Sequence, residues 1–393
     1  MPIDIYFLNL FTWSLMGKRK AVFSVLSVFL VITGITILVY RETAKNRIPT
    51  PSFQRERLID IEFEEGLGKG CSAFELVEKS SADQSRYRLL KKIWQKNRPF
   101  LVQATSSKIP KVIHQIWLGP KSPPSYYRKF STEWKQAHPD WEYHLWTDAN
   151  IKDFDFELRD LFDNSTNYGE KADILRCELL YRYGGLYVDT DFECMGPFDE
   201  LVERYDFFAG IEPPHEIPES SRVLLVSDAL VGSVPGHPVL KRWKEHIRKK
   251  WYQAENECFD PIEKVLIRTF FTFGKAVEEC IETGEYCNII FPSTYFYPIQ
   301  PKYLRKPPQP QTIIKKMLCA LGLKKELCFY KTCPETLAIH HFAARWQKST
   351  IQLFKEMHQE IVKLRRQQSK LTYEVDELRQ QLYRDHKGEN NVT

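Results

Sequence analysis

The chain has 393 residues, which is enough for one large catalytic domain with appendages or for two small domains. Hydrophobic residues make up 43% of it and aromatic residues 13%, a composition that favours a folded core. The net charge of +5 is small for this length, and the sequence has no basic stripe interleaved with aromatic residues. It therefore does not indicate a protein that binds nucleic acid.

Residues 21–40 predict a membrane anchor. They form a run without a charged side chain, and its length matches the hydrocarbon core of a bilayer. Basic residues lie on both sides of the run, but Glu42 weakens the second flank. Residues 1–20 are therefore the favoured cytoplasmic tail of a single-pass type II anchor. A buried core helix is one alternative, and a cleaved signal peptide, whose apolar region would be shorter, is the other.

The sequence after the predicted anchor predicts a stem over residues 41–107. This segment is charged and weakly periodic, with some helix expected between Ser80 and Gln95. The predicted stem ends near Lys108, where the composition changes to a short run of β-forming residues bounded by Pro110 and Pro120.

A folded domain is predicted over residues 108–348, because strand-like and helix-like segments alternate there. The expected strands are Glu142–Trp146, Leu186–Asp189 and Asp206–Gly210, and the expected helices are Glu170–Tyr183 and Pro238–Lys250. Alternation of this kind predicts an α/β domain with a mainly parallel sheet.

Residues 350–385 predict a coiled coil. Mostly apolar residues there step alternately by three and four positions: Phe354, Met357, Ile361, Leu364, Gln368, Leu371, Val375, Leu378 and Leu382. This heptad pattern favours a coiled coil that oligomerises the protein. A helix packed on its own domain has the same periodicity and stays open as the alternative.

The nine cysteines match no zinc-binding spacing. Two close sets could hold disulfides if the domain is lumenal, and free buried thiols are the alternative. The sets are Cys258, Cys280 and Cys287, and Cys319, Cys328 and Cys333. Short glycosylation sequons begin at Asn164 and Asn391, which gives only weak support for a secretory location.

The stretch Leu179–Glu193, LLYRYGGLYVDTDFE, places two aspartates one residue apart. Gly184 is suited to end the preceding helix, and residues 186–188 then form a short apolar strand. Asp189 and Asp191 follow at the carboxyl end of that strand, where ligands bind in open α/β sheets. A turn is the alternative, because aspartate and threonine are common in turns, but the segment lacks a glycine or asparagine for a tight reversal.

Arg176 lies on the apolar face of the predicted helix, and Asp173 lies at the edge of this face, one turn earlier. A charge directed at the sheet is costly unless it is paired or serves a ligand. A structural pair between these two residues is one interpretation. A ligand site shared with Asp189 and Asp191 is the favoured one.

Two carboxylates and a cation at a strand end suit a reaction on a diphosphate. Hard ions such as Mg²⁺ and Mn²⁺ prefer oxygen ligands. An ion held in this way can neutralise a diphosphate leaving group, and Arg176 can share that charge. These parts indicate a nucleotide-sugar site, although a phosphatase uses similar parts.

Four segments together resemble a known enzyme family: HQIWLG at 114–119, EKADILRCELLYRYGGLYVDTD at 170–191, GHP at 236–238 and HHFAARW at 340–346. They are similar to the DXD-containing sugar transferases of glycosyltransferase family 32, which includes Golgi mannosyltransferases and α-1,4-glycosyltransferases. They are also similar to the catalytic domain of large clostridial glucosylating toxins. The resemblance covers residues 108–346 and implies a GT-A fold, a Mn²⁺- or Mg²⁺-dependent reaction and retention of the anomeric configuration.

The resemblance also implies a metal site. Asp191 is the implied direct ligand, and Asp189 would hold ribose and sugar hydroxyls, partly through the metal. His341, or its neighbour His340, is the implied late ligand of the metal or a phosphate. A histidine that merely satisfies a polar site is the alternative for this pair.

The implied donor contacts lie around this site. Asp173 and Arg176 would grip the donor sugar. The implied nucleotide-binding residues are Trp117 on the base or ribose, Tyr187, Asp228, and Trp346 closing over the diphosphate. Trp117 as a plain core residue is the alternative.

The sequence as a whole predicts a retaining, metal-dependent glycosyltransferase that moves a hexose from a UDP- or GDP-sugar to a glycan, glycolipid or protein acceptor. The expected location is the Golgi or ER, with the domain in the lumen. Segments Val226–Ser233 and Arg268–Ala276 depart from the family pattern, so the donor base, the sugar and the acceptor stay open.

Two alternative functions share some of these sequence features. A phosphohydrolase with Asp189 as nucleophile is disfavoured, because Glu193 stands where that pattern needs threonine or valine. A non-catalytic, membrane-anchored coiled-coil scaffold with a degenerate sugar-binding domain is the second alternative.

Overall fold

The computed structural model describes residues 58–99, 108–216, 222–258, 260–300 and 332–343, together with Gln368, Lys370, Leu371 and Val375. All of them belong to one compact unit, Arg55–Thr393. The predicted anchor at 21–40 lies outside the described residues, and so does most of the predicted coiled coil. Within the described ranges, no helix is both long enough and apolar enough to cross a membrane.

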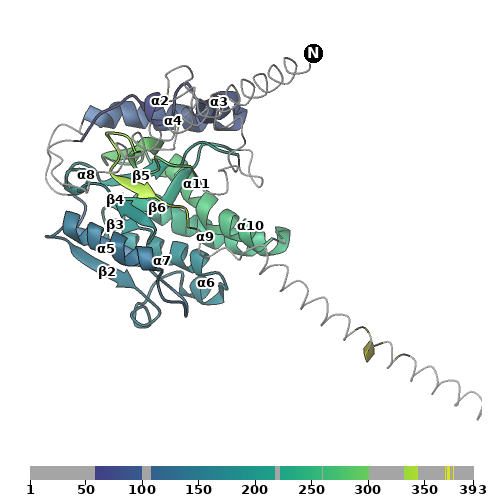
Figure 1. Cartoon of the computed structure of the whole chain (residues 1–393). Helices are drawn as coiled ribbons and strands as arrows, with labels where there is room; N and C mark the ends of the chain where they lie inside the picture. Colours follow the sequence, from purple (N-terminus) through teal and green to yellow (C-terminus); the bar gives the residue numbers. More distant parts are fainter. Residues whose placement is uncertain are drawn as a thin grey trace, which may run out of the picture. The chain divides into compact units, whose positions relative to one another are not determined.

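A six-stranded mixed sheet forms the centre of the domain (Figure 1). Its strand order is β2 (Glu142–Trp146), β1 (Val112–Ile116), β3 (Gly185–Val188), β6 (Val226–Ser233), β5 (Phe207–Ile211) and β7 (Asn288–Phe291). β1 runs parallel to β2 and β3, and β5 runs parallel to β7, whereas β6 is antiparallel to both of its neighbours. The α/β class is confirmed, and the expected mainly parallel sheet is corrected to a mixed one.

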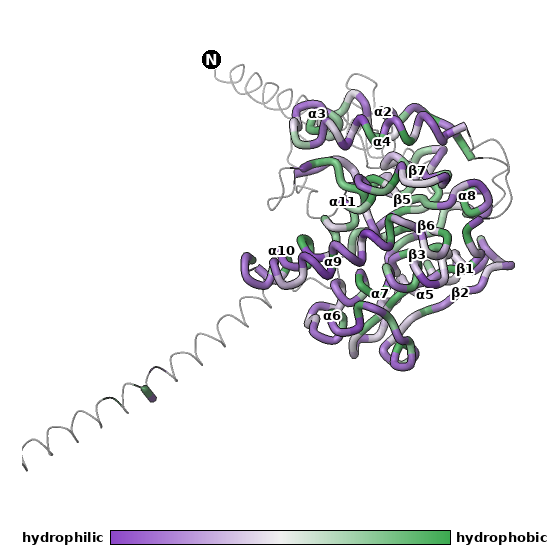
Figure 2. The backbone as a smooth tube through the Cα atoms, turned by 180° about the vertical axis from the view of Figure 1, so that it is seen from behind, coloured by the Kyte–Doolittle hydropathy of each residue, from purple (hydrophilic) through white to green (hydrophobic). Residues whose placement is uncertain are grey.

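The correction comes from β6, which the sequence analysis does not identify as a strand. All eight of its residues, VSDALVGS, are buried, so it lacks the alternation of a half-exposed strand. β3, β5 and β7 are also buried along their whole length. Figure 2 shows the contrast between the hydrophobic strands and the largely hydrophilic helix α9 at the outside.

A separate two-stranded sheet joins distant parts of the chain. β4 (Phe192–Cys194) pairs antiparallel with β8 (Ala338–His340), and Phe192 lies opposite His340. This pairing returns the C-terminal end of the domain to the segment that follows the two aspartates.

The helices in chain order are α2 (Phe63–Gly66), α3 (Ser72–Lys79), α4 (Gln84–Asn97), α5 (Ser125–Ala137), α6 (Arg159–Asn164), α7 (Tyr168–Tyr183), α8 (Asp199–Arg204), α9 (Pro238–Glu257), α10 (Pro261–Val265) and α11 (Phe271–Cys280). Short turns are η1 (Ser81–Asp83), the π-helical η3 (Leu266–Phe270) and η4 (Ser293–Tyr295). The expected helices are confirmed as α7 and α9, and the expected strands as β2, β3 and β5.

Helix α7 ends at Gly184, as predicted. Gly184 has a φ of 65°, and its N–H donates to the carbonyl of Leu180. Gly185 has a φ of 97°, and a Cβ there would lie 2.5 Å from the side chain of Val112 on β1. This glycine pair lets the chain reverse from α7 into β3 against β1, which fixes where β3 ends and the aspartates begin.

Residues 58–99 lie inside the segment predicted as a stem, yet they pack on the edge of the sheet. Trp94 of α4 is fully buried, with its ring edge-on to Phe291 of β7 and to Tyr295. Asn97 donates from Nδ2 to the carbonyl of Asn288 at 2.6 Å. At least these helices therefore belong to the folded domain, and the extent of a stem before them stays a prediction.

The cysteines divide between the two expected states. Cys258, Cys280 and Cys287 are free thiols, so the first proposed disulfide set is wrong. Cys71 is disulfide-bonded. Cys319 and Cys328 of the second set lie outside the described residues.

His237, just before α9, is held as a neutral imidazole. Its Nδ1 accepts from the N–H of Val239 at 3.3 Å, and its Nε2 donates to Oδ1 of Asn288 at 3.0 Å. Burial lowers the pKa of His237 to about 4. Protonation of His237 would remove the hydrogen bond that caps the start of α9, because a protonated Nδ1 cannot accept from the N–H of Val239.

We therefore expect the stability deficit of His237→Asn to shrink by about 2 kcal/mol between pH 7 and pH 5. The unfolded wild-type chain binds this proton below about pH 6.5, whereas the folded chain binds it only near pH 4. The wild type thus loses stability as the pH falls through this window, and the variant lacks that loss. Denaturant unfolding of the full-length chain at both pH values measures the difference, and a constant difference would contradict the assignment.

Candidate functional site

The two aspartates follow β3 in a turn at the carboxyl end of this inner strand. The N–H of Asp189 donates to the carbonyl of Ala229 on β6, and the N–H of Phe192 donates back to the carbonyl of Asp189 at 3.2 Å. Gln115 of β1 also donates to the Asp189 carbonyl, at 3.3 Å. The turn posed as an alternative is present, and it forms without a glycine. The ligand site stays a prediction.

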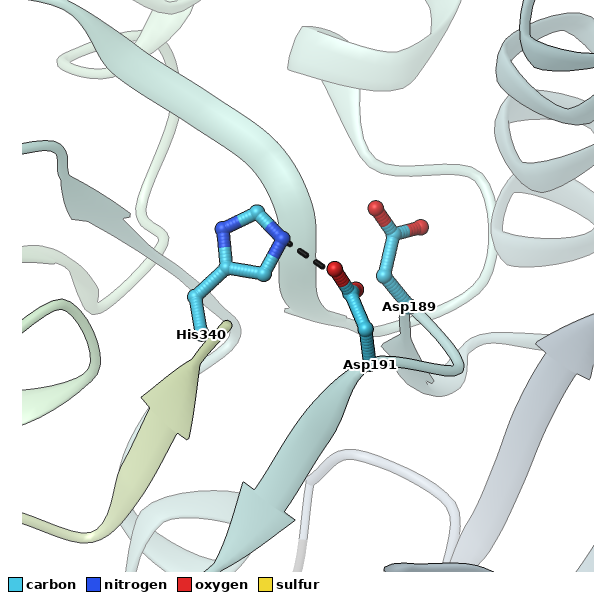
Figure 3. Close-up of side chains that lie close together, drawn as sticks. All are labelled: Asp189, Asp191 and His340. Atoms are coloured by element: carbon cyan, nitrogen blue, oxygen red, sulfur yellow. Dashed lines mark ion pairs between the residues drawn. The ribbon is translucent and has the colours of Figure 1, made fainter. Parts of the chain in front are cut away.

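Asp189, Asp191 and His340 form one candidate metal site (Figure 3). One ligand atom from each residue lies within 4.8 Å of the other two. Oδ1 of Asp191 is 3.2 Å from Nε2 of His340, and Oδ2 of Asp191 accepts from the N–H of Ala343 at 2.6 Å. Two carboxylates and an imidazole form a donor set that suits Mn²⁺.

The geometry of Asp191 and His340 fits a shared ion. Neighbouring ligands of an octahedral ion lie about 3 Å apart at bond lengths near 2.1 Å, close to the 3.2 Å between these two atoms. The imidazole is held flat on the ring of Phe192, with centroids 4.5 Å apart and planes 6° apart. Burial alone would raise the pKa of Asp191. The nearby His340 and the N–H of Ala343 outweigh the effect of burial, so the pKa of Asp191 is lowered to about 2. Asp191 is therefore ionised, as a metal ligand must be.

The structure separates the two neighbouring histidines. Nε2 of His341 is 3.0 Å from Oε2 of Glu193, and its ring stacks on Phe130 at 5.0 Å. Lys129 of α5 holds the other oxygen of Glu193 at 2.9 Å, and the N–H of His341 donates to the carbonyl of Asp191. We call Lys129, Phe130, Glu193 and His341 the β8 latch, because they tie the end of β8 to α5 and β4.

The β8 latch places His340 beside Asp191. We therefore expect Glu193→Gln to weaken Mn²⁺ binding about tenfold. This is the lower end of the loss seen when a residue that orients a metal ligand is changed. The neutral amide has one accepting oxygen where the carboxylate has two, so it cannot hold Lys129 and His341 in the same way, and β8 is held less firmly. A Mn²⁺ titration of the full-length chain followed by EPR measures this. Glu142→Gln on the exposed side of β2 is the matched control. An unchanged affinity in Glu193→Gln would show that β8 needs no latch.

Arg176 of α7 lies at the centre of a second group. Its Nη2 is 2.8 Å from Asp173 and 3.2 Å from Asp189, and its Nη1 is 3.3 Å from the carboxylate of Asp228 and donates to the Asp228 carbonyl. The guanidinium carbon lies 4.4 Å from the ring centre of Tyr187, whose hydroxyl donates to Asp189 at 2.6 Å. The structural pair of Arg176 with Asp173 is thus present, and Arg176 also contacts Asp189. A ligand site shared with the two aspartates stays a prediction.

One guanidinium serves three carboxylates in this arginine cluster. Burial raises the pKa of Asp173, and it raises that of Asp228 to about 6, although Arg176 opposes both shifts. Burial also lowers the pKa of Arg176, but Asp189 and Asp228 outweigh it, so Arg176 stays charged. Arg176 thus holds three carboxylates together beside the turn after β3.

Two of the predicted site residues remain, Trp117 and Trp346. Trp117 follows β1 directly and is half-buried, and its Nε1 donates to the carbonyl of Lys121 at 2.6 Å. Trp346 lies outside the described residues. The roles given to Trp117, Tyr187, Asp228 and Trp346 in nucleotide binding stay predictions.

Two contributors were missed by sequence reasoning. Thr269 of η3 donates from its hydroxyl to Asp173 at 2.6 Å, and no sequence signal links these distant residues. Glu193 follows Asp191 at the strand period of two, so the alternation of Asp189, Asp191 and Glu193 was a readable signal.

A family comparison covers the region that carries the aspartates. The family described as "glycosyltransferase sugar-binding region containing DXD motif" matches residues 124–208, which include α7, β3, Asp189 and Asp191. In this region the chain is similar to the DXD-containing glycosyltransferases. The family resemblance stated from the motifs is thus confirmed.

Individual proteins are similar to part of this chain. It is 34% identical over 151 residues to mannosyl phosphorylinositol ceramide synthase SUR1 of Saccharomyces cerevisiae, covering 37% of each chain. It is 31% identical over 139 residues to inositol phosphoceramide mannosyltransferase 3 of Schizosaccharomyces pombe, covering 34% of this chain and 36% of that protein. The matches thus span little more than a third of these relatives.

A solved structure was also found similar. The catalytic domain of alpha-toxin from Clostridium novyi shares 12% identity, with 74% of this chain and 90% of that chain covered and a TM-score of 0.36. A score this low carries no argument about fold or activity.

Proposed function

We propose that this protein is a metal-dependent glycosyltransferase with a GT-A fold that moves a hexose from a nucleotide-sugar to an acceptor with retention. The observation that carries the proposal is the convergence of Asp189, Asp191 and His340 at the carboxyl end of β3. This edge lies in the segment that matches the DXD family. His340 rather than His341 is the proposed third ligand, because His341 is engaged by Glu193.

The residues present have the chemistry that such a transfer needs. A divalent cation held by Asp189, Asp191 and His340 would neutralise the charge that develops on the departing diphosphate. Asp173 and Asp228 hold Arg176 in position, and Arg176 in turn orients Asp189. Tyr187 fixes the same carboxylate from β3. The turn after β3 is thus preorganised before a donor binds.

Mannose is the proposed donor sugar. The two yeast relatives described above are named as inositol phosphoceramide mannosyltransferase and mannosyl phosphorylinositol ceramide synthase. These names support a mannose donor and a lipid acceptor for this chain. The donor base stays open between UDP and GDP.

We also propose that the domain faces the lumen of the Golgi or ER behind the anchor at 21–40. The disulfide at Cys71 supports an oxidising compartment.

We further propose that the predicted coiled coil pairs with a second copy of the chain. Two residues on its seam, Leu371 and Val375, are 61% and 45% exposed, which supports this pairing.

Incubation of the full-length chain with Mn²⁺ and a panel of UDP- and GDP-sugars tests this function. We expect one donor to release its nucleoside diphosphate and EDTA to abolish the release. If no donor is turned over and none binds in a metal-dependent way, the chain acts as the non-catalytic scaffold instead.

A further inference from the structure

The loop between α6 and α7 carries a sequence motif that the proposed function does not use. Asn164, the last residue of α6, begins the triplet Asn-Ser-Thr, which ends at Thr166. In secreted chains, an asparagine two residues before a serine or threonine can accept an N-linked glycan when the middle residue is not proline. Whether such a triplet suits a glycan depends on where the fold directs its three side chains.

The middle residue of the triplet faces the protein. Ser165 is buried, and its hydroxyl donates to Oε2 of Glu170 at 2.6 Å and accepts from the N–H of Asn167 at 3.1 Å. The N–H of Ser165 donates to the carbonyl of Leu161 at 3.0 Å, which closes the last turn of α6. These contacts hold the loop to the domain through its middle residue.

The two residues on either side of Ser165 face the solvent. Ser165 has extended backbone angles, with φ −69° and ψ 139°. The neighbours of an extended residue direct their side chains away from the face to which its own side chain points. Asn164 and Thr166 are accordingly exposed. The amide that would carry the glycan and the hydroxyl that the motif requires thus lie on the outer side of the loop.

The fold does not use the polar groups of these two side chains. In the part of the chain that the structure describes, the side chains of Asn164 and Thr166 make no hydrogen bond or ion pair. The nearby Asn167 differs, because its amide oxygen accepts from the N–H groups of Gly169 and Glu170 and so caps α7. A bulky polar group on Asn164 would therefore break no polar contact of the folded domain.

The loop is separate from the proposed metal site and from the arginine cluster. α6 lies at the outside of the domain beside α7 (Figure 1). Asp173, the first residue of α7 in the arginine cluster, lies on the second turn of that helix. Changes at Asn164 and Thr166 therefore leave the residues of both groups in place.

We propose that Asn164 is a site of N-linked glycosylation. The inference rests on the proposed lumenal placement of the domain, because the glycan donor, an oligosaccharide linked to a lipid diphosphate, is used in the lumen. Nδ2 of Asn164 attacks the anomeric carbon of this oligosaccharide. A nitrogen–carbon bond forms, the bond between the anomeric carbon and the diphosphate oxygen breaks, the lipid diphosphate leaves with the electron pair, and one amide proton is released.

The first experiment uses the full-length chain made in a eukaryotic secretory system and treated with peptide N-glycosidase. The parent carries Asn391→Gln, which removes the second sequon. Asn164→Gln, Thr166→Ala and the conservative Thr166→Ser are each added to it. We expect the treatment to shift the gel mobility of the parent and of Thr166→Ser, and to leave Asn164→Gln and Thr166→Ala unchanged. Mass spectrometry of the treated parent should find aspartate at position 164, because the enzyme converts a glycan-bearing asparagine to aspartate.

Two results of this experiment would overturn the inference. One is a parent whose mobility does not change on treatment, and the other is a shift that persists in Asn164→Gln. The serine variant separates the chemistry of the motif from a folding defect, because it keeps the hydroxyl at position 166 that Thr166→Ala removes.

Protease treatment of sealed microsomes reports the placement of the domain independently. A domain that resists the protease but carries no glycan at Asn164 overturns this inference alone. A domain that is digested overturns the lumenal placement and this inference together. Failure of the proposed transfer would appear instead as an absence of metal-dependent nucleotide release by the wild type, with or without a glycan.

Discussion

Asp191→Asn is expected to reduce Mn²⁺ affinity and nucleotide release by more than about a hundredfold, beyond the loss seen for residues that only orient a ligand. The asparagine keeps an oxygen that can accept from the N–H of Ala343, so the turn after β3 should persist. What the variant loses is the negative charge beside His340. A neutral amide oxygen is a much weaker ligand for a hard divalent ion than a carboxylate.

The measurement pairs a Mn²⁺ titration with an assay of nucleoside diphosphate release by the same full-length protein. Asp163→Asn is the matched control, because Asp163 is exposed and contacts Arg159 within its own short helix. An Asp191→Asn variant that folds, binds Mn²⁺ normally and still releases nucleotide would remove Asp191 from the metal site.

Arg176→Gln is expected to destabilise the domain by roughly 3–5 kcal/mol, the typical cost of removing one partner from a buried ion pair. The variant leaves Asp173 and Asp228 buried beside Asp189 without their cation. Activity should fall with stability, because the turn that presents Asp189 loses its contact to α7.

The pH dependence of Arg176→Gln distinguishes this cause from a simple packing defect. Without the cation, the folded-state pKa values of Asp173 and Asp228 rise further above those of the unfolded chain. Protonation then favours the folded state, so the variant should regain part of its lost stability as the pH falls from 7 toward 5. Denaturant unfolding of the wild type, Arg176→Gln and Arg176→Lys measures this. A deficit that does not change with pH would mean that lost packing, not unpaired charge, is the cause.

Local sequence patterns predicted the part of the site that is contiguous in the chain. The helix ending at Gly184, the strand after it and the two aspartates lie within one short segment, where capping, periodicity and strand-end position all act locally. The same segment predicted that Arg176 faces the sheet beside Asp173. Burial of Arg176 and its contacts with Asp173 and Asp189 agree with that prediction.

The parts of the fold and of the site that depend on long-range contacts could not be predicted from the sequence. The choice between His340 and His341 depends on the register of β8 against β4, which pairs residues about 150 positions apart. Strand β6 was not recognised because both of its faces are buried, so its sequence carries no alternation. Thr269 reaches Asp173 only through the packing of η3 against α7. Such contacts leave no periodic signal in a single sequence.

Pulsed EPR of Mn²⁺ bound to the full-length chain tests the proposed metal site most directly, because it detects a nitrogen nucleus coupled to the ion. We expect the nitrogen coupling in the wild type and in His341→Ala, and we expect it to disappear in His340→Ala. Coupling that is lost in His341→Ala and kept in His340→Ala, or a wild-type protein that binds no Mn²⁺ even with a nucleoside diphosphate present, would contradict the site of Asp189, Asp191 and His340.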